Sequence, residues 1–284
     1  MGYNLKIIVC CHKEDPNIRE DSIYMPLHVG KALSNKDLGF QGDDSGDNIS
    51  YKNKNYCELT GLYWAWKNLK CEYIGLCHYR RYFNLDASQI NCEKFFDKYD
   101  IVLPKVNILP FNLAESFSSL LTREDLYLLL TVLFDKYPQH KKKIIDYFYN
   151  NNHSTSFNMF ISKKELSDKY CEWLFDILLE LEKLLKESGY SRLRRIYGYI
   201  GEYLLPLFCK INDLNVKRIN VVQFTENQSG KFHNILHYMD NIRKNLVFFL
   251  LKYPLKNFPP SMNAIRIGLI NDGINIIDDY KYRK

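Results

Sequence analysis

Two apolar runs that end abruptly in polar and charged residues constrain the fold of this chain most. Residues 5–11 form one run, followed by His12-Lys13-Glu14-Asp15, and residues 73–77 form another, followed by His78-Tyr79-Arg80-Arg81. Strands that are apolar on both faces are typical of parallel sheets covered by helices, and such sheets place ligand chemistry at the carboxyl ends of their strands. The sequence therefore predicts an α/β fold with a functional site where these two strands end.

Arg80 and Arg81 give the first indication of a ligand. A planar guanidinium group matches the oxygens of a phosphate, so two adjacent arginines at a strand end favour an anionic ligand, with diphosphate as the obvious candidate. The alternative is a surface basic pair flanked by core aromatics, with one of the arginines paired to a structural carboxylate.

The other apolar patterns alternate between strand and helix. Short apolar runs predict further strands over residues 100–103, 157–161 and 216–222. Helices are predicted within residues 23–33 after the proline, over 55–68, from 122 to before Pro138, over 139–149, 164–187 and 235–253, and near Glu202. Residues 37–50 are expected to form a polar loop. This alternation favours a mostly parallel sheet flanked by helices, with a helical C-terminal appendage.

The positive charge of the chain is concentrated near its end. Residues 210–284 hold 12 Lys and Arg against 6 Asp and Glu, so this segment accounts for the whole net charge of +6. A locally basic segment beside a neutral remainder fits an anionic membrane surface better than a nucleic acid. We therefore expect no nucleic acid as a partner.

Cysteine usage and the N-terminus indicate the compartment. The eight cysteines include no CxxC pair and no zinc-type spacing, which indicates free thiols in a reducing compartment. The N-terminal residues enter a strand directly without the layout of a signal peptide, and no apolar stretch approaches the ~20 residues that span a bilayer. We expect a cytoplasmic protein without a transmembrane helix.

Four stretches, in a fixed order, resemble a known family. They are residues 43–68 (DDSGDNISYKNKNYCELTGLYWAWKN), 73–83 (YIGLCHYRRYF), 156–178 (SFNMFISKKELSDKYCEWLFDIL) and 194–205 (RRIYGYIGEYLL). Over roughly residues 4–225, the chain resembles a bacterial family long known only as a domain of unknown function, whose members occur in capsule, exopolysaccharide and O-antigen gene clusters. That family is similar to glycosyltransferases of the GT-A type, and some members are galactosyl- or galactofuranosyltransferases that use UDP-sugars.

The resemblance implies a GT-A-like glycosyltransferase domain over residues 1–225, followed by a basic amphipathic tail over residues 226–284. The implied reaction moves a hexose, galactose as pyranose or furanose, from a UDP-sugar to a lipid-linked saccharide with inversion at the anomeric carbon. The tail suits a peripheral position on the inner face of the plasma membrane, or else it packs on the domain or on a second copy. A non-catalytic sugar-nucleotide or glycan-binding protein on the same fold is the alternative function.

One departure from the GT-A pattern concerns metal. GT-A enzymes usually carry Asp-x-Asp after a central strand to hold a divalent cation on the diphosphate, but this chain carries His78-Tyr79-Arg80-Arg81 there. Two arginines neutralise phosphate charge without a metal, so we expect no permanently bound cofactor and no metal ligand. The alternative is a Mn²⁺ or Mg²⁺ site formed by His78 and an aspartate of the loop over residues 43–47.

Further roles follow for individual residues. The residues predicted to bind the donor are His78, Arg80, Arg81, Asp44, Asp47, Asn48, Glu58 and Trp64. Turn formation is the alternative role of Asp44, Asp47 and Asn48. Stabilisation of a helix dipole is the alternative for Glu58, and core packing is the alternative for Trp64.

The predicted catalytic residue is Glu202. Inverting transfer needs a group that takes the proton of the acceptor hydroxyl, and burial between two apolar runs would raise the pKa of this carboxyl toward neutrality. Its alternative role is an ion pair with Arg194 or Arg195. Asn158 is predicted to orient the acceptor, and for His78 a hydrogen-bonded structural role remains the alternative.

Overall fold

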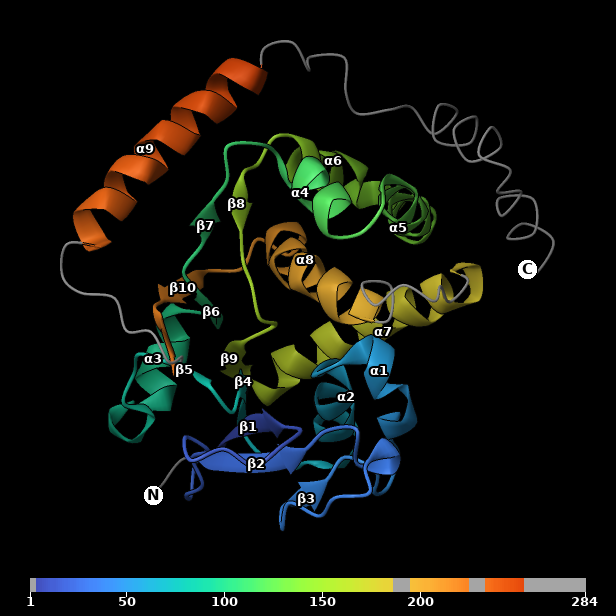
Figure 1. The fold of residues 1–284 in the computed structure, drawn as a ribbon, viewed down its shortest axis with the longest axis vertical. Helices are drawn as coiled ribbons and strands as arrows, with labels where there is room; N and C mark the ends of the chain where they lie inside the picture. Colours follow the sequence, from blue (N-terminus) through green and yellow to red (C-terminus); the bar gives the residue numbers. More distant parts are fainter. Residues whose placement is uncertain (1–3, 186–194, 225–232, 253–284) are drawn as a thin grey trace. The chain divides into compact units, whose positions relative to one another are not determined.

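The computed structural model describes residues 4–185, 195–224 and 233–252 (Figure 1). The chain divides into two compact units that interleave along the sequence. Unit 1 comprises Met1–Asn107, Thr155–Leu174 and Arg194–Ser229, and unit 2 comprises Ile108–Ser154, Phe175–Leu193 and Gly230–Lys284. The division of the chain at residue 225 stays a prediction.

Unit 1 is built on a sheet of nine strands among the described residues. Its order is β10-β6-β9-β4-β1-β2-β3, with β5 paired to β4 and β11 paired to β5. The strands are β1 (Leu5–Cys11), β2 (Tyr24–His28), β3 (Gln41–Gly42), β4 (Tyr73–His78), β5 (Arg81–Phe83), β6 (Ile101–Pro104), β9 (Phe160–Lys163), β10 (Val216–Ile219) and β11 (Val221–Gln223). The run β3-β2-β1-β4 is parallel throughout, whereas β9 is antiparallel to both of its neighbours. The predicted α/β class, with a mostly parallel sheet flanked by helices, is confirmed.

Both units contain helices. Those of unit 1 are α1 (Asn53–Tyr56), α2 (Leu59–Asn68), α3 (Cys92–Lys98) and α8 (Ile196–Ile211); those of unit 2 are α4 (Leu113–Leu120), α5 (Arg123–Lys136), α6 (Lys141–Tyr149) and α9 (His233–Lys252). Helix α7 (Lys164–Leu184) runs from unit 1 into unit 2, and β7 (Asn107–Ile108) pairs with β8 (His153–Ser154) in a separate sheet. Within the described ranges, none of the helices combines the length and the apolar character needed to cross a bilayer.

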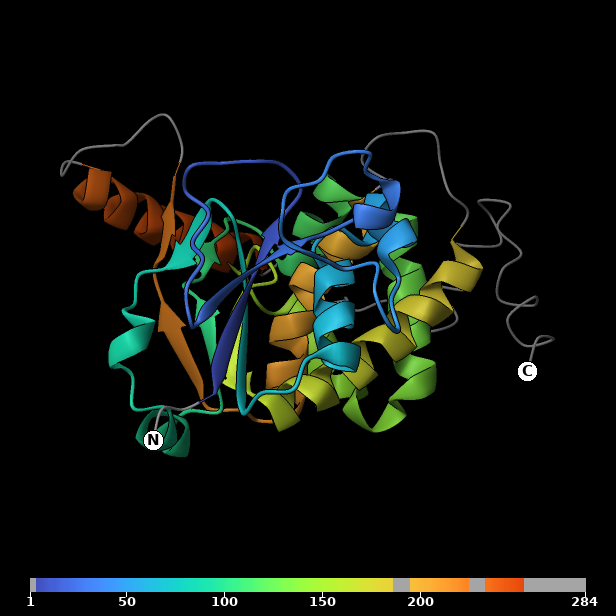
Figure 2. The same ribbon diagram turned by 90° about the horizontal axis from the view of Figure 1, so that it is seen from below.

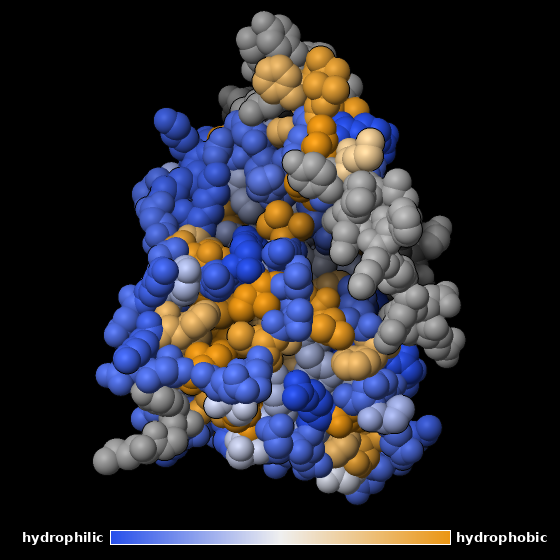
Figure 3. Space-filling view, turned by 90° about the vertical axis from the view of Figure 1, so that its left-hand side faces the viewer, coloured by the Kyte–Doolittle hydropathy of each residue, from blue (hydrophilic) through white to orange (hydrophobic). Residues whose placement is uncertain are grey.

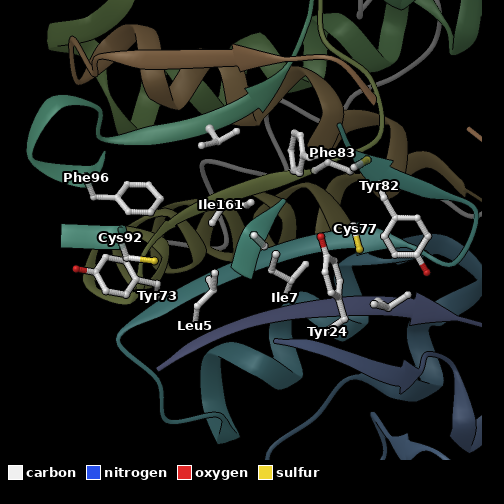
Figure 4. Close-up of a cluster of buried hydrophobic side chains, with 14 of the residues drawn as sticks. Leu5, Ile7, Tyr24, Tyr73, Cys77, Tyr82, Phe83, Cys92, Phe96 and Ile161 are labelled. Carbon is white, nitrogen blue, oxygen red and sulfur yellow. The ribbon is translucent and has the colours of Figure 1, made fainter. Parts of the chain in front are cut away.

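The core of unit 1 follows from the alternation of side chains along β1. Every second residue of β1, from Leu5 to Cys11, faces a cluster that includes Tyr73 and Phe96, whose stacked rings lie 5.3 Å apart (Figure 4). Successive strand residues point to opposite faces, so Cys10 faces the other side, where α2 packs. There a Cβ on Gly61 of α2 would lie 3.2 Å from Cys10 Sγ and 2.8 Å from Val29 Cγ1, which only a glycine avoids.

The two faces of the sheet therefore carry different helices. Figure 2 shows α2 (cyan) and α8 (orange) together on one side of the strands, and the aromatic side chain of Phe96 brings α3 onto the other. Helix α8 is joined to α1 by the rings of Tyr56 and Tyr197, 4.5 Å apart. This pair places the start of α8 beside the α1–α2 junction, next to the carboxyl ends of β1 and β4.

Several sequence predictions need correction. Residues 24–28 form β2 rather than a helix; Pro26 fits there because β3 pairs only with Leu27 and His28, so no neighbour needs the missing N–H. The helix predicted over 55–68 is broken at Cys57, whose φ is 50°. The strand predicted over 216–222 is split at Asn220, and helices α3 and α4 were not predicted.

A further correction concerns the segment around Glu202, where a short helix was predicted. It is the 16-residue helix α8, with Pro206 inside it and 13 of its residues buried. A helix buried on nearly all sides has no polar face, so its sequence lacks the amphipathic period by which helices are recognised.

Candidate functional site

A cavity of about 500 Å³ lies in unit 1 where β1 and β4 end. The cavity is lined by the ends of these strands, the α1–α2 junction, the β4–β5 turn, Phe157 and the first turns of α8. Five of the predicted site residues line it: Glu58, His78, Arg80, Arg81 and Glu202. Residues up to 213 positions apart in the chain, Cys10 and Gln223, thus line one cavity at the edge of the sheet where the sequence predicts a site.

The two arginines of the β4–β5 turn have different surroundings. Arg80 Nε donates to Asp15 Oδ2 at 2.5 Å, and the side chain of Asp15 is only 2% exposed. Burial acts to raise the pKa of Asp15, but hydrogen bonds from Asn17 and Arg80 outweigh burial and lower that pKa. Arg80 thus has the structural carboxylate partner that was its alternative, while it also lines the cavity.

The guanidinium of Arg81 lies over an aromatic ring. The guanidinium carbon is 4.4 Å from the ring centroid of Phe157, a cation–π distance. This contact holds the guanidinium at the cavity wall, because both residues line it.

Sequence reasoning missed three basic side chains of the cavity as ligand-binding residues: His12, Lys54 and Arg195. Arg195 Nε donates to Cys57 Sγ at 3.3 Å. Burial, followed by the charges of Lys13 and Arg195, lowers the pKa of His12. The only sequence signal for His12 was its place directly after the apolar run of β1, the same signal that identified His78 directly after the apolar run of β4.

Two carboxylates sit among these basic groups. Glu58 is 8% exposed and accepts a hydrogen bond of 2.7 Å from Asn158 Nδ2 at Oε1. Burial and then the neighbouring charge of Glu58 raise the pKa of Glu202 to about 7, against lowering contributions from the backbone N–H of Phe157 and from Arg81 and Arg195. A carboxyl with a pKa near neutrality is suited to proton transfer at physiological pH.

The loop that was predicted to bind the donor lies elsewhere. Asp44, Asp47, Asn48 and Trp64 do not line the cavity as the described residues form it. The OH of Tyr63 donates to Asp47 Oδ1 at 3.1 Å, Asn48 Nδ2 donates to the Asp44 carbonyl, and Trp64 is 6% exposed with Nε1 donating to Ser45. These are the turn and packing contacts that were the alternatives, so donor binding by these four residues rests on the sequence alone.

The carboxylate of Asp43 ties this loop to neighbouring segments by hydrogen bonds. This buried carboxylate accepts from the backbone N–H groups of Gly30 and Lys31 and from the hydroxyl groups of Ser50 and Thr60. A carboxylate with four donors is fully satisfied within the protein. Within the described residues, no group of three or more His, Cys, Asp or Glu side chains is placed to hold a metal ion.

Comparison with known proteins agrees with this fold. A solved apo structure of WbbM, a bifunctional glycosyltransferase, superimposes with a TM-score of 0.71 at 30% sequence identity. The similarity covers 80% of this chain but 46% of the WbbM chain, so this chain spans about half of that protein's length. No curated protein matches the chain.

Fold and cavity together define an α/β domain with a cavity, lined by basic side chains and two carboxylates, at the carboxyl ends of its parallel strands. Residues 6–213 match the family described as Domain of unknown function (DUF4422), and the chain belongs to that family.

Proposed function

We propose that this chain is a glycosyltransferase of cell-surface polysaccharide synthesis, which moves galactose, as pyranose or furanose, from a UDP-sugar to a lipid-linked saccharide. The observation that carries the proposal is the cavity, which combines several basic side chains with two carboxylates, one of them with a raised pKa. The likeness to WbbM supports glycosyl transfer as the reaction class.

The basic side chains would hold the donor diphosphate. Arg81, Arg195 and Lys54 come from three different segments and line one cavity. Charged donors in a partly desolvated site stabilise the charge that develops on the leaving phosphate. We therefore propose that these side chains neutralise the diphosphate and that catalysis needs no metal ion.

Glu202 would act as the base. The acceptor hydroxyl oxygen attacks the anomeric carbon of the sugar, the bond from that carbon to the phosphate oxygen breaks, and UDP leaves with the bonding electron pair. The carboxylate of Glu202 takes the proton that the hydroxyl loses. A single displacement of this kind inverts the anomeric configuration.

Helix α9 supports the proposed membrane position of the acceptor. It exposes apolar side chains at helical spacing, each more than half exposed: Met239, Ile242, Leu246, Phe249 and Leu250. Hydrophobic surface is visible at the upper part of the face drawn in Figure 3. The exposed cation of Arg243 lies on the same helix, and Lys256, in the predicted basic tail over residues 226–284, lies outside the described residues. An apolar stripe with basic residues suits the surface of an anionic bilayer.

The test is direct. The protein is screened by thermal shift against UDP-, GDP-, CMP- and dTDP-sugars, and release of UDP from UDP-galactose is measured with and without saccharide acceptors. We expect a UDP-sugar to raise the unfolding midpoint and UDP to be released, because a ligand that binds only the folded state stabilises it. Binding without any release would favour the non-catalytic sugar-nucleotide-binding protein. No binding by any UDP-sugar would refute the proposal.

Glu165→Gln is the matched control for Glu202→Gln, because each variant replaces one carboxylate with an amide. Glu202→Gln should lower UDP release, whereas Glu165→Gln should not, because Glu165 is an exposed residue of α7 that pairs with Lys169. Equal activity of both variants would exclude Glu202 as the base.

A further inference from the structure

The turn formed by Phe157 and Asn158 has an unusual backbone. Both residues have positive φ angles, 83° and 51°, although neither is glycine. Such conformations are strained and persist where surrounding contacts enforce them, often at functional sites. Of the four non-glycine residues with positive φ in the described chain, Cys57 and Phe157 line the cavity and Asn158 bonds to Glu58.

Phe157 contacts three site residues with three different groups. Its carbonyl accepts from His78 Nε2 at 2.7 Å, which requires the proton of that imidazole to be on Nε2. Its backbone N–H donates to the carboxylate of Glu202, and its ring lies under the guanidinium of Arg81. One residue thus fixes the direction of a histidine, a carboxylate and an arginine.

Asn158 connects the two segments that carry the carboxylates. Its Nδ2 donates to Glu58 Oε1 at 2.7 Å and to the carbonyl of Gly198 at 2.9 Å. Glu58 directly precedes α2, and Gly198 lies one turn before Glu202 on α8. Both N–H groups of the amide are therefore used, and they determine its orientation, because the Glu58 carboxylate only accepts.

The space for this amide is made by a glycine. A Cβ on Gly201 would lie 2.9 Å from Asn158 Oδ1, so a larger residue there would displace the amide. The Asn158 side chain is 2% exposed, and its Oδ1 has no hydrogen-bond partner among the described residues. An unpaired buried acceptor costs free energy. The side chain keeps this orientation because its Nδ2 donates two hydrogen bonds.

We infer that the Phe157–Asn158 turn is the positioning element of the site, which holds Glu58, Glu202 and His78 in fixed relation around the cavity. Asn158 is then a positioning residue that acts through Glu58 on the neighbouring Glu202, rather than a residue that contacts the acceptor. The catalytic consequence rests on the proposed function, whereas the geometric relation between the turn and the carboxylates does not.

The first experiment uses Asn158→Asp in the full chain. Aspartate tolerates positive φ but replaces the amide donors with a third carboxylate beside Glu58 and Glu202. Among the described residues, the charged groups that act on Glu202 are Glu58, Arg81 and Arg195, so the added negative charge should raise the pKa of Glu202 by about one unit. This pKa is followed by ¹³C NMR of the glutamate carboxyls, with the Glu202 signal assigned from Glu202→Gln.

Kinetics supply a second readout. We expect the rate of UDP release from UDP-galactose to fall ~10–100-fold, as for loss of a group that orients a reacting residue, while calorimetric affinity for UDP changes little. An unchanged pKa of Glu202 together with wild-type activity would overturn the inference. A loss of UDP affinity as large as the loss of rate would also overturn it.

A second variant covers a failure of Asn158→Asp to fold. Asn158→Gly adopts positive φ freely and removes the amide, so turnover should fall while UDP affinity persists. Asp213→Gly is the matched control, because Asp213 has a φ of 52° and does not line the cavity. Full activity of Asn158→Gly would overturn the inference. If the wild-type protein releases no UDP, the proposed function fails, and the NMR titration still decides whether the turn positions Glu202.

Discussion

Replacing Glu202 with glutamine should stabilise the protein at high pH and not at low pH. The pKa of Glu202 is raised from an ordinary value near 4.5 to about 7, first by burial and then by Glu58. A carboxyl with a raised folded-state pKa contributes stability that is present below pH ~4.5 and lost as the pH rises through ~7, because the folded state must then hold a buried charge.

The magnitude follows from this shift. A displacement of about 2.5 pKa units corresponds to ~3 kcal/mol when the carboxyl is ionised in both states, at 1.36 kcal/mol per unit. Near pH 8 this cost is almost complete, and near pH 5 it is under ~1 kcal/mol. Glutamine is neutral at every pH and keeps an oxygen that accepts from the N–H of Phe157, so Glu202→Gln escapes the cost.

The assay is urea unfolding of the wild type and the variant between about pH 5 and pH 8. The difference in the free energy of unfolding should grow by ~2–3 kcal/mol in favour of the variant across this interval. Glu165→Gln serves as control, since that carboxylate is exposed and the hydrogen bond from Lys169 lowers its pKa. A difference between Glu202→Gln and wild type that does not change with pH would refute the assigned burial and charge of Glu202.

Three further outcomes are expected. Arg81→Gln should weaken UDP binding by ~1.5–3 kcal/mol in calorimetry, the worth of a charged hydrogen bond, whereas Arg123→Gln on the exposed start of α5 should not; equal affinities would remove Arg81 from the donor site. UDP release should survive EDTA, because basic side chains supply the positive charge; complete loss with rescue by Mn²⁺ would contradict this. Phe249→Ser should reduce sedimentation with anionic liposomes and leave UDP binding intact, since this side chain is 67% exposed on α9; unchanged sedimentation would oppose the membrane role.

Local signals in the sequence were sufficient for the elements that carry the sheet. Strands β1 and β4 appear as apolar runs, interrupted in β1 by Lys6, because they are almost entirely buried, and the polar residues at or after their ends mark the predicted site. Thr122 and Asp125 predict the start of helix α5, where they form a capping box. Each of these features depends on neighbours within a few residues, which a sequence displays directly.

Local sequence patterns identified only some of the residues that line the cavity. His78, Arg81, Glu58 and Glu202 were singled out by their place in the pattern, and all four line the cavity. Trp64 was predicted to bind the donor, with core packing as the alternative, and its buried indole donates a hydrogen bond to Ser45 of the loop over residues 43–50. The pattern of one helix does not reveal which other segment covers its side.

Tertiary structure alone decided how the site residues relate to one another. The hydrogen bond from Asn158 to Glu58 spans 100 positions, and that from Arg195 to Cys57 spans 138. The raised pKa of Glu202 depends on burial and on Glu58, a charge 144 residues earlier in the chain. The sequence determined which residues reach the ends of the strands, because that follows from local periodicity. Only the packing of α2, α8 and the Phe157–Asn158 turn determined their contacts, because these arise between segments that no local pattern connects.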